Sequence, residues 1–244
     1  MADVMLALTR TLASLRQGKI WLYVLIPALV SLIFTAGFAL WGLGLLVEQM
    51  LAYPPMTLLI SWGLVWLAYA LAYLGGWMAI FAAAYLTASL LAAIIILPLM
   101  LNHLARTEYQ DIAPMGADSF TAATVNSVLA SILFIAAWLI TLPLWLIPGL
   151  SLILPMLLMA WLNRRTFAYD ALSMHATEDE WRDLKQRHKT PLFMLGLTMS
   201  LLAHIPILGL LVPAITALSF VHYGLEALRR TRDGALVTIL GDHL

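Results

Sequence analysis

Basic side chains that could bind an anion stand next to one another at residues 164 and 165. Arg164 follows a long apolar run and is followed at once by Arg165, and Asp170 comes about one and a half helical turns later. Guanidinium groups recognise oxyanions through paired hydrogen bonds. The segment therefore predicts either a charged entrance for an anion or an ion pair at the edge of the apolar run, and both interpretations stay open.

Signatures of catalysis are missing from the sequence. It contains no His-Glu-x-x-His, no Gly-x-Ser-x-Gly and no phosphate-binding loop, and it has no cysteine for a disulfide or a thiolate metal site. His175 and the acidic run 178–180 suggest a metal site, but Thr177 and Glu180 have the spacing of a helix capping box, which explains the same acids. We therefore expect a protein that is not an enzyme, without cofactor or metal.

Two similar stretches carry prolines and glycines inside apolar sequence. Residues 147–155 read IPGLSLILP and residues 205–213 read IPILGLLVP; both have nine residues, and five positions are identical. Proline and glycine are the residues least suited to a helix interior, so they are placed where a chain must turn. We predict that Pro148-Gly149 and Pro206 with Gly209 form the tips of two helical hairpins.

The composition requires lipid as the main solvent. Of the 244 residues, 63% are hydrophobic and 11% are charged, and the mean hydropathy is +0.93. Soluble domains carry about 25% charged residues. The formal net charge is zero, which gives no reason to expect a nucleic-acid partner. The sequence thus predicts an all-α integral membrane protein whose partner is the lipid bilayer.

The chain is expected to form a single membrane domain over residues 1–244. The elements expected from apolar runs and helix breakers are an amphipathic helix over 1–19, long helices over 20–47 and 56–101, helical hairpins over 120–163 and 190–225, and a cytoplasmic helical segment over 164–189. A bend is expected near Gly75-Gly76 or Pro98.

The hairpin limbs are short for a bilayer. The limb Leu150–Asn163 has 14 residues and would rise about 21 Å, whereas the hydrocarbon core is about 30 Å thick. We therefore expect re-entrant, partly inserted hairpins; six full spans are the alternative. With the N-terminus inside, either arrangement puts every lysine and arginine on the cytoplasmic side, as the positive-inside rule requires.

Several stretches resemble one family of membrane proteins. Four stretches resemble, in the same order, the CysZ family of bacterial sulfate permeases and its wider superfamily. They are LYVLIPALVSLIF near the start, LPLMLNHLARTEY in the middle, and then IPGLSLILPMLLMAWLNRRTFAYDAL and LGLTMSLLAHIPILGLLVPA. The resemblance implies two long transmembrane helices, two partly inserted hairpins, a homo-oligomer, and sulfate uptake across the bacterial inner membrane for cysteine synthesis.

The likeness also assigns residues. Sulfate permeases of this kind often carry Gly-x-Arg-Arg before the first membrane helix, where it contacts the anion, but this chain reads Lys19-Ile20-Trp21-Leu22 in that register. We expect Arg16, Gly18 and Lys19 to take over anion capture. The pathway would then consist of the tips Pro148, Gly149, Pro206 and Gly209, whose half-helices aim N–H groups inward, and of a vestibule formed by Arg164, Arg165 and Asp170.

Two other functions fit the same sequence. The first is transport of another small solute by the same fold. The second is a membrane organiser without transport, which would bind a partner through residues 164–190.

Overall fold

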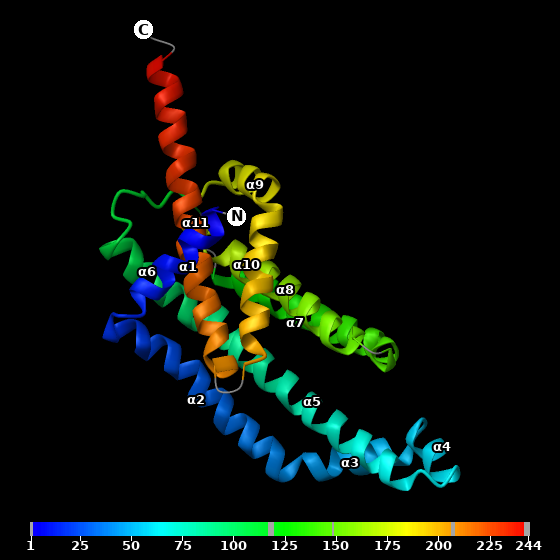
Figure 1. The fold of residues 1–244 in the computed structure, drawn as a ribbon. Coiled ribbons are helices and arrows are strands. Elements are labelled where there is room, and N and C mark those ends of the chain that lie inside the picture. The colour runs from blue at the N-terminus through cyan, green and yellow to red at the C-terminus, as the bar shows by residue number, and fades with distance from the viewer. Residues whose placement is uncertain (1, 117–119, 148, 206–207, 242–244) are drawn as a thin grey trace. The chain divides into compact units, whose positions relative to one another are not determined.

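The computed structural model describes residues 2–116, 120–147, 149–205 and 208–241. Those residues form helices and no β-strand (Figure 1). The helices are α1 (Ala2–Ser14), α2 (Gly18–Trp41), α3 (Leu43–Ala52), α4 (Met56–Ser61), α5 (Val65–Leu91), the π-helix η1 (Ala92–Ile96), α6 (Leu97–Thr107), α7 (Phe120–Thr141), the 3-10 helix η2 (Leu142–Leu146), α8 (Leu150–Asp170), α9 (Glu178–Arg187), α10 (Lys189–Ala203) and α11 (Leu208–Gly241). The chain divides into two compact units, one formed by residues 28–88 and the other by 1–27 with 89–244.

The helices are those of a multi-pass membrane protein. Four in the described part are long and apolar enough to cross a bilayer: Gly18–Trp41, Val65–Thr107, Thr121–Trp145 and Leu208–Asp233. Large apolar side chains on them are open to the surroundings, and Leu40 and Trp41 are 83% and 84% exposed. Water would penalise such a surface by roughly 25 cal/mol for each Å², so lipid or another apolar partner must cover it.

The unit of residues 28–88 is a helical hairpin. Its limbs approach closely at small residues, because a Cβ on Gly75 would meet Met50 of α3 and one on Gly76 would meet Leu43. Ser31 donates a hydrogen bond of 2.8 Å to the carbonyl of Ala84, which ties α2 to α5. At Gly75-Gly76, one of the two places expected to be bent or broken, α5 continues without a break, and both glycines allow close packing.

The irregularity expected near Pro98 is present as the π-helical turn η1. Its closing bond runs from the Leu97 N–H to the carbonyl of Ala92, five residues earlier. Proline has no N–H and its ring crowds the preceding turn, so a wider turn directly before Pro98 relieves the clash. The chain stays helical through this point and continues as α6.

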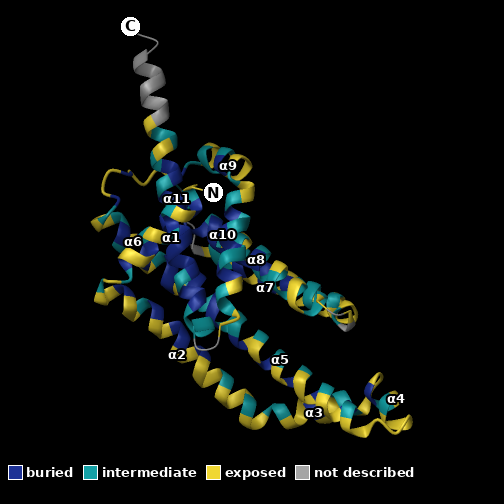
Figure 2. Ribbon diagram, in the orientation of Figure 1, coloured by how far each residue is buried: buried dark blue, intermediate teal, exposed yellow. Residues whose placement is uncertain are grey.

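The larger unit is built around α11. Most of the apolar part of this helix is buried, as its dark colour in Figure 2 shows, and α1, α6, α8 and α10 pack against it. The buried core of the unit includes Phe167 and Phe220, whose rings lie 6.1 Å apart, and Leu218 and Val221 of α11. Since protein covers α11, its polar side chains can find partners there that lipid would not provide.

Both predicted hairpins are present as pairs of packed helices. α7 packs against α8 and α10 packs against α11 (Figure 1). The second limbs run further than the apolar stretches: α8 continues to Asp170, and α11 continues to Gly241 instead of ending near Leu225. The arginines at the end of α11 form ion pairs, and those of α8 are half-buried or exposed, so their charges do not end either helix. Partial insertion of the hairpins remains a prediction.

The two predicted tips differ in how glycine acts. Gly149 precedes α8 and has φ +88°, a left-handed conformation that favours glycine. Gly209 lies inside α11, and a Cβ there would collide with the carbonyl oxygen of Ala203 at the end of α10. Glycine thus permits a turn at the first tip and a close approach at the second. The predicted tip residues Pro148 and Pro206 lie outside the described residues.

Replacing Gly149 with alanine is expected to destabilise the protein by about 1–2 kcal/mol, because a left-handed conformation costs an L-residue that much. Nothing lies within 4 Å of the position where the new Cβ would stand, so backbone strain is the whole effect. Thermal unfolding in detergent measures it. Gly37→Ala is the control, since Gly37 is helical, exposed and equally free of neighbours, and alanine there should be neutral or stabilising.

Candidate anion site

A cationic cavity lies between the polar end of α8 and the short helix α9. Its volume is about 190 Å³, which is room for a small oxyanion together with water. The cavity is lined by Asn126, Trp161, Arg164, Arg165, Ala168, Tyr169, Trp181, Lys185 and Leu192. Three of these side chains are basic, and no carboxylate is among them. The arrangement can therefore hold a negatively charged ligand by charge-assisted hydrogen bonds.

Within the described part of the chain, the basic groups of this cavity have no acidic partner. Among the described residues, the ion pairs of arginine are formed by residues 10, 182, 187, 229, 230 and 232, and none involves Arg164, Arg165 or Lys185. Arg164 is half-buried and Arg165 and Lys185 are exposed, so solvent and ligands can reach them. Their positive charge is available to an anion.

Local sequence positions the two sides of the cavity. On α9, Thr177 accepts a hydrogen bond from the Glu180 N–H, and the Glu180 carboxylate accepts one from the Thr177 N–H. The predicted capping box is therefore confirmed, and it fixes the start of the helix that carries Trp181 and Lys185. The indole of Trp181 lies edge-on to Tyr169 of α8, with ring centroids 5.5 Å apart. This aromatic contact holds α9 against the arginine-bearing end of α8.

Asp170 does not belong to this cavity. Its carboxylate forms no ion pair with Arg164 or Arg165, and it points into a different cavity beside α6 and α7. The two interpretations of the sequence both placed the three residues together. The structure separates them because Asp170 lies one and a half turns further along α8 and so faces another side of the helix.

The residues expected to capture the anion before the first membrane helix lie at the junction of α1 and α2. Arg16, Gly18 and Lys19 are all exposed. Gly18 and Lys19 form the first turn of α2, where unpaired N–H groups favour anions. Neither of the two cavities described here is lined by these residues, so the structure does not bring them together with Arg164 and Arg165.

A buried polar network is the feature that the sequence did not reveal. His222 of α11 is fully buried, and both its ring nitrogens have partners: Ser14 of α1 lies 2.9 Å from Nε2 and the Tyr109 hydroxyl 2.9 Å from Nδ1. The Ser14 hydroxyl donates its one hydrogen to Glu108, so it must accept from the Nε2–H of His222. Nδ1 then accepts the hydrogen of Tyr109.

The network continues to charged groups at both ends. Gln17 donates to the carboxylate of Glu108 at 2.9 Å, and Arg10 donates to the Tyr109 hydroxyl and pairs with Glu226 at 3.1 Å. Burial raises the pKa of Tyr109 to about 12, so its hydroxyl remains a donor at physiological pH. The partners of His222 lie far apart in the chain, so no short motif marks this network. The signal in the sequence that could have indicated the network is the position of His222 within an apolar helix, where a polar side chain needs partners.

The fold and the cavity define a class: an all-helical, multi-pass membrane protein with an unneutralised basic cavity at the polar end of its helices. The model of the family described as sulfate transporter CysZ/Etoposide-induced protein 2.4 matches residues 7–213, so the chain belongs to this family. The resemblance seen in the sequence is thereby confirmed. Comparisons with curated proteins and with solved structures gave no match.

Proposed function

We propose that this protein takes up sulfate, or a similar small oxyanion, across the bacterial inner membrane, where sulfate would feed cysteine synthesis. The observation that carries the proposal is the cavity of Arg164, Arg165 and Lys185, which collects three basic side chains without an acidic partner among the described residues. A doubly charged anion is expensive to remove from water, and fixed positive groups offset that cost. Membership of a family described as sulfate transporters supports the same function.

We assign two successive roles to the basic groups. Arg16 and Lys19 would capture the anion at the N-terminus of α2, where the N–H groups of the first turn, including Gly18, add donors. Arg164, Arg165 and Lys185 would form the vestibule. The hairpin tips at Gly149 and Gly209 would line the path through the bilayer, with the hairpins inserted partway. Assembly into a homo-oligomer belongs to the same proposal.

The test is sulfate binding and uptake by variants with fewer charges. Arg164→Gln combined with Arg165→Gln should weaken sulfate binding about tenfold or more, since a hydrogen bond to a charged group contributes roughly 1.5–3 kcal/mol. Titration of sulfate into purified protein, with chloride as the competing anion, measures affinity, and labelled sulfate entering proteoliposomes measures transport. Arg16→Ala with Lys19→Ala tests the capture site in the same way.

The matched control is Arg182→Gln combined with Arg187→Gln. Both arginines are exposed on α9 and already paired with acids of the same helix, so their loss should leave sulfate affinity unchanged. Equal affinity of the wild type and the Arg164/Arg165 variant would remove the vestibule from the anion site. A wild type that binds no sulfate would direct the search to another solute or to a partner of residues 164–190.

A further inference from the structure

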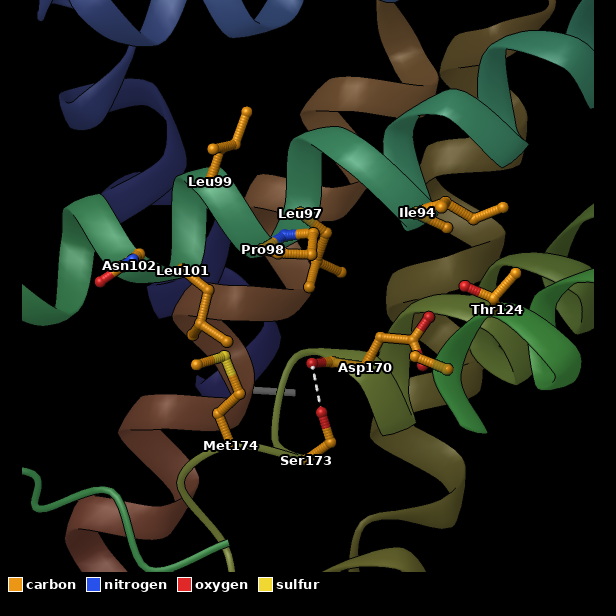
Figure 3. A pocket seen from close by; sticks show the side chains of 12 residues that line it. Ile94, Leu97, Pro98, Leu99, Leu101, Asn102, Thr124, Asp170, Ser173 and Met174 are labelled. Carbon is orange, nitrogen blue, oxygen red and sulfur yellow. Dashed lines mark hydrogen bonds between the residues drawn. The ribbon is translucent and has the colours of Figure 1, made fainter. Parts of the chain in front are cut away.

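A second cavity contains a buried carboxylate without a counter-charge. It measures about 250 Å³ and lies beside η1, α6, α7 and the turn after α8 (Figure 3). One wall is apolar and includes Ile94, Leu97, Leu99 and Leu101. The polar groups are the side chains of Asn102, Thr124, Asp170 and Ser173. Among the described residues, no lysine, arginine or histidine lines the cavity.

The Asp170 carboxylate is incompletely satisfied. The residue is 4% exposed, and its Oδ2 accepts one hydrogen bond of 3.1 Å from Ser127. Its Oδ1 is buried and has no partner among the described residues, and the same holds for the hydroxyl oxygen of Thr124. In Figure 3 the carboxyl group of Asp170 and the hydroxyl group of Thr124 point toward one another across the cavity. A buried charge in this state requires a partner or a proton.

The helical wall is interrupted beside the cavity. In the π turn the Leu97 N–H donates to the carbonyl of Ala92, and the next residue, Pro98, has no N–H to donate to the preceding turn. Ala93, Leu97 and Pro98 all line the cavity. Interrupted helices present carbonyl groups to cations in this way. The cavity thus combines oxygen acceptors with a single negative charge.

We propose that this cavity binds a protonated primary amine with a short apolar body. An ammonium group has three donors and one positive charge, which match Asp170 Oδ1, the Thr124 hydroxyl and the side-chain oxygens beside them. The apolar wall fits the carbon chain of such a ligand. Divalent ions are a poor fit, because they require several carboxylates and the described residues contain no group of three acidic, histidine or cysteine side chains. A bare sodium ion would leave most of this volume empty.

The proposal implies a definite pH dependence. Burial raises the pKa of Asp170 to about 7, while the hydrogen bond from Ser127 acts against this rise. Only the ionised carboxylate attracts an ammonium ion, so binding strengthens as pH rises through this range, where a primary amine stays charged. Among the described residues, the polar groups that face Asp170 are Asn102 of α6, Thr124 and Ser127 of α7 and Ser173 of the following turn, and none of them titrates in this pH range.

The test uses the full chain in detergent and butylammonium as the ligand. Calorimetric titration should show binding near pH 8 that weakens about tenfold for each pH unit below the pKa of Asp170. Asp170→Asn keeps the shape and should weaken binding at least tenfold, and Thr124→Val should weaken it less. Asp179→Asn, on an exposed residue of α9, should change nothing. The neutral isostere butanol should bind far more weakly than butylammonium.

Other outcomes distinguish the source of the amine or overturn the proposal. If an aminophospholipid is the natural occupant, butylammonium should bind more weakly in nanodiscs containing phosphatidylethanolamine than in phosphatidylcholine alone, and Asp170→Asn should abolish this difference. If a soluble amine is the occupant, the two nanodiscs should behave alike. Three results would overturn the proposal. They are equal affinity of the wild type and Asp170→Asn for butylammonium, no binding of butylammonium by the wild type, and binding of sodium as strong as that of butylammonium. Sulfate transport is measured separately and does not decide this outcome.

Discussion

Replacing His222 with leucine is expected to lower the free energy of unfolding by roughly 1.5–4.5 kcal/mol, because two buried groups lose a partner: one is left without an acceptor, at a cost of about 1–3 kcal/mol, and the other loses one hydrogen bond but keeps its bond to Glu108, at a cost of about 0.5–1.5 kcal/mol. These groups are the hydroxyls of Ser14 and Tyr109, which bond to the two ring nitrogens at 2.9 Å. Leucine fills much of the space but can neither donate nor accept. Thermal unfolding of the purified protein measures the loss.

His204→Leu is the matched control. His204 is exposed at the end of α10, and its ring bonds to the carbonyl of Ser200 in its own helix, so the change should cost less than about 0.5 kcal/mol. His222→Gln should retain part of the stability, since an amide can donate to one neighbour and accept from the other. If His222→Leu were as stable as the wild type, the network would not hold α1 and α6 to α11.

Alanine in place of Gly196 is expected to cost about 1–3 kcal/mol, the usual cost of overpacking. Gly196 of α10 faces α8, and a Cβ there would stand 2.6 Å from the carbonyl oxygen of Ala160. Backbone cannot move aside as a flexible side chain does, so α8 and α10 would have to separate. Small residues commonly allow this close approach between helices in membranes.

The same change should also weaken anion binding, because α8 carries both arginines of the cationic cavity. Size-exclusion profiles and thermal unfolding report the packing defect, and sulfate titration reports its effect at the cavity. Gly44→Ala is the control, since Gly44 is helical and a Cβ there would meet nothing within 4 Å. A Gly196→Ala variant with wild-type stability would mean that the two helices adjust without cost.

The distribution of arginine partners separates structural from functional charge. Arg229 binds Asp111 and Glu226, and Arg232 binds Glu180, so these side chains join α11 to the segments beside it. The hydrogen bond from Arg229 lowers the pKa of Asp111, and that from Arg232 lowers the pKa of Glu180. Arg164 and Arg165 have no such partners among the described residues. A group that stabilises nothing internally is the better candidate for binding an external ion.

The sequence by itself determined the class of protein and some of the places where its helices break, although the breaks at Gly42 and at 62–64 fall inside the expected helices 20–47 and 56–101. Composition required lipid, the paired Ile-Pro stretches marked the ends of both hairpins, and Thr177 with Glu180 marked the start of α9. These features are local: a helix breaker, a cap or an apolar run acts on the residues next to it. The family resemblance was also readable at this level, because it rests on residues in chain order.

Only the tertiary structure decided which polar groups meet. Ser14 and His222 are 208 positions apart, yet they share a hydrogen bond in the core. Asp170 and Arg165 are close in sequence, yet they line different cavities. Partners of this kind depend on which faces of packed helices meet, and helix packing is set by the sum of many weak apolar contacts. These contacts involve residues from all parts of the chain, so no short stretch of the sequence predicts them.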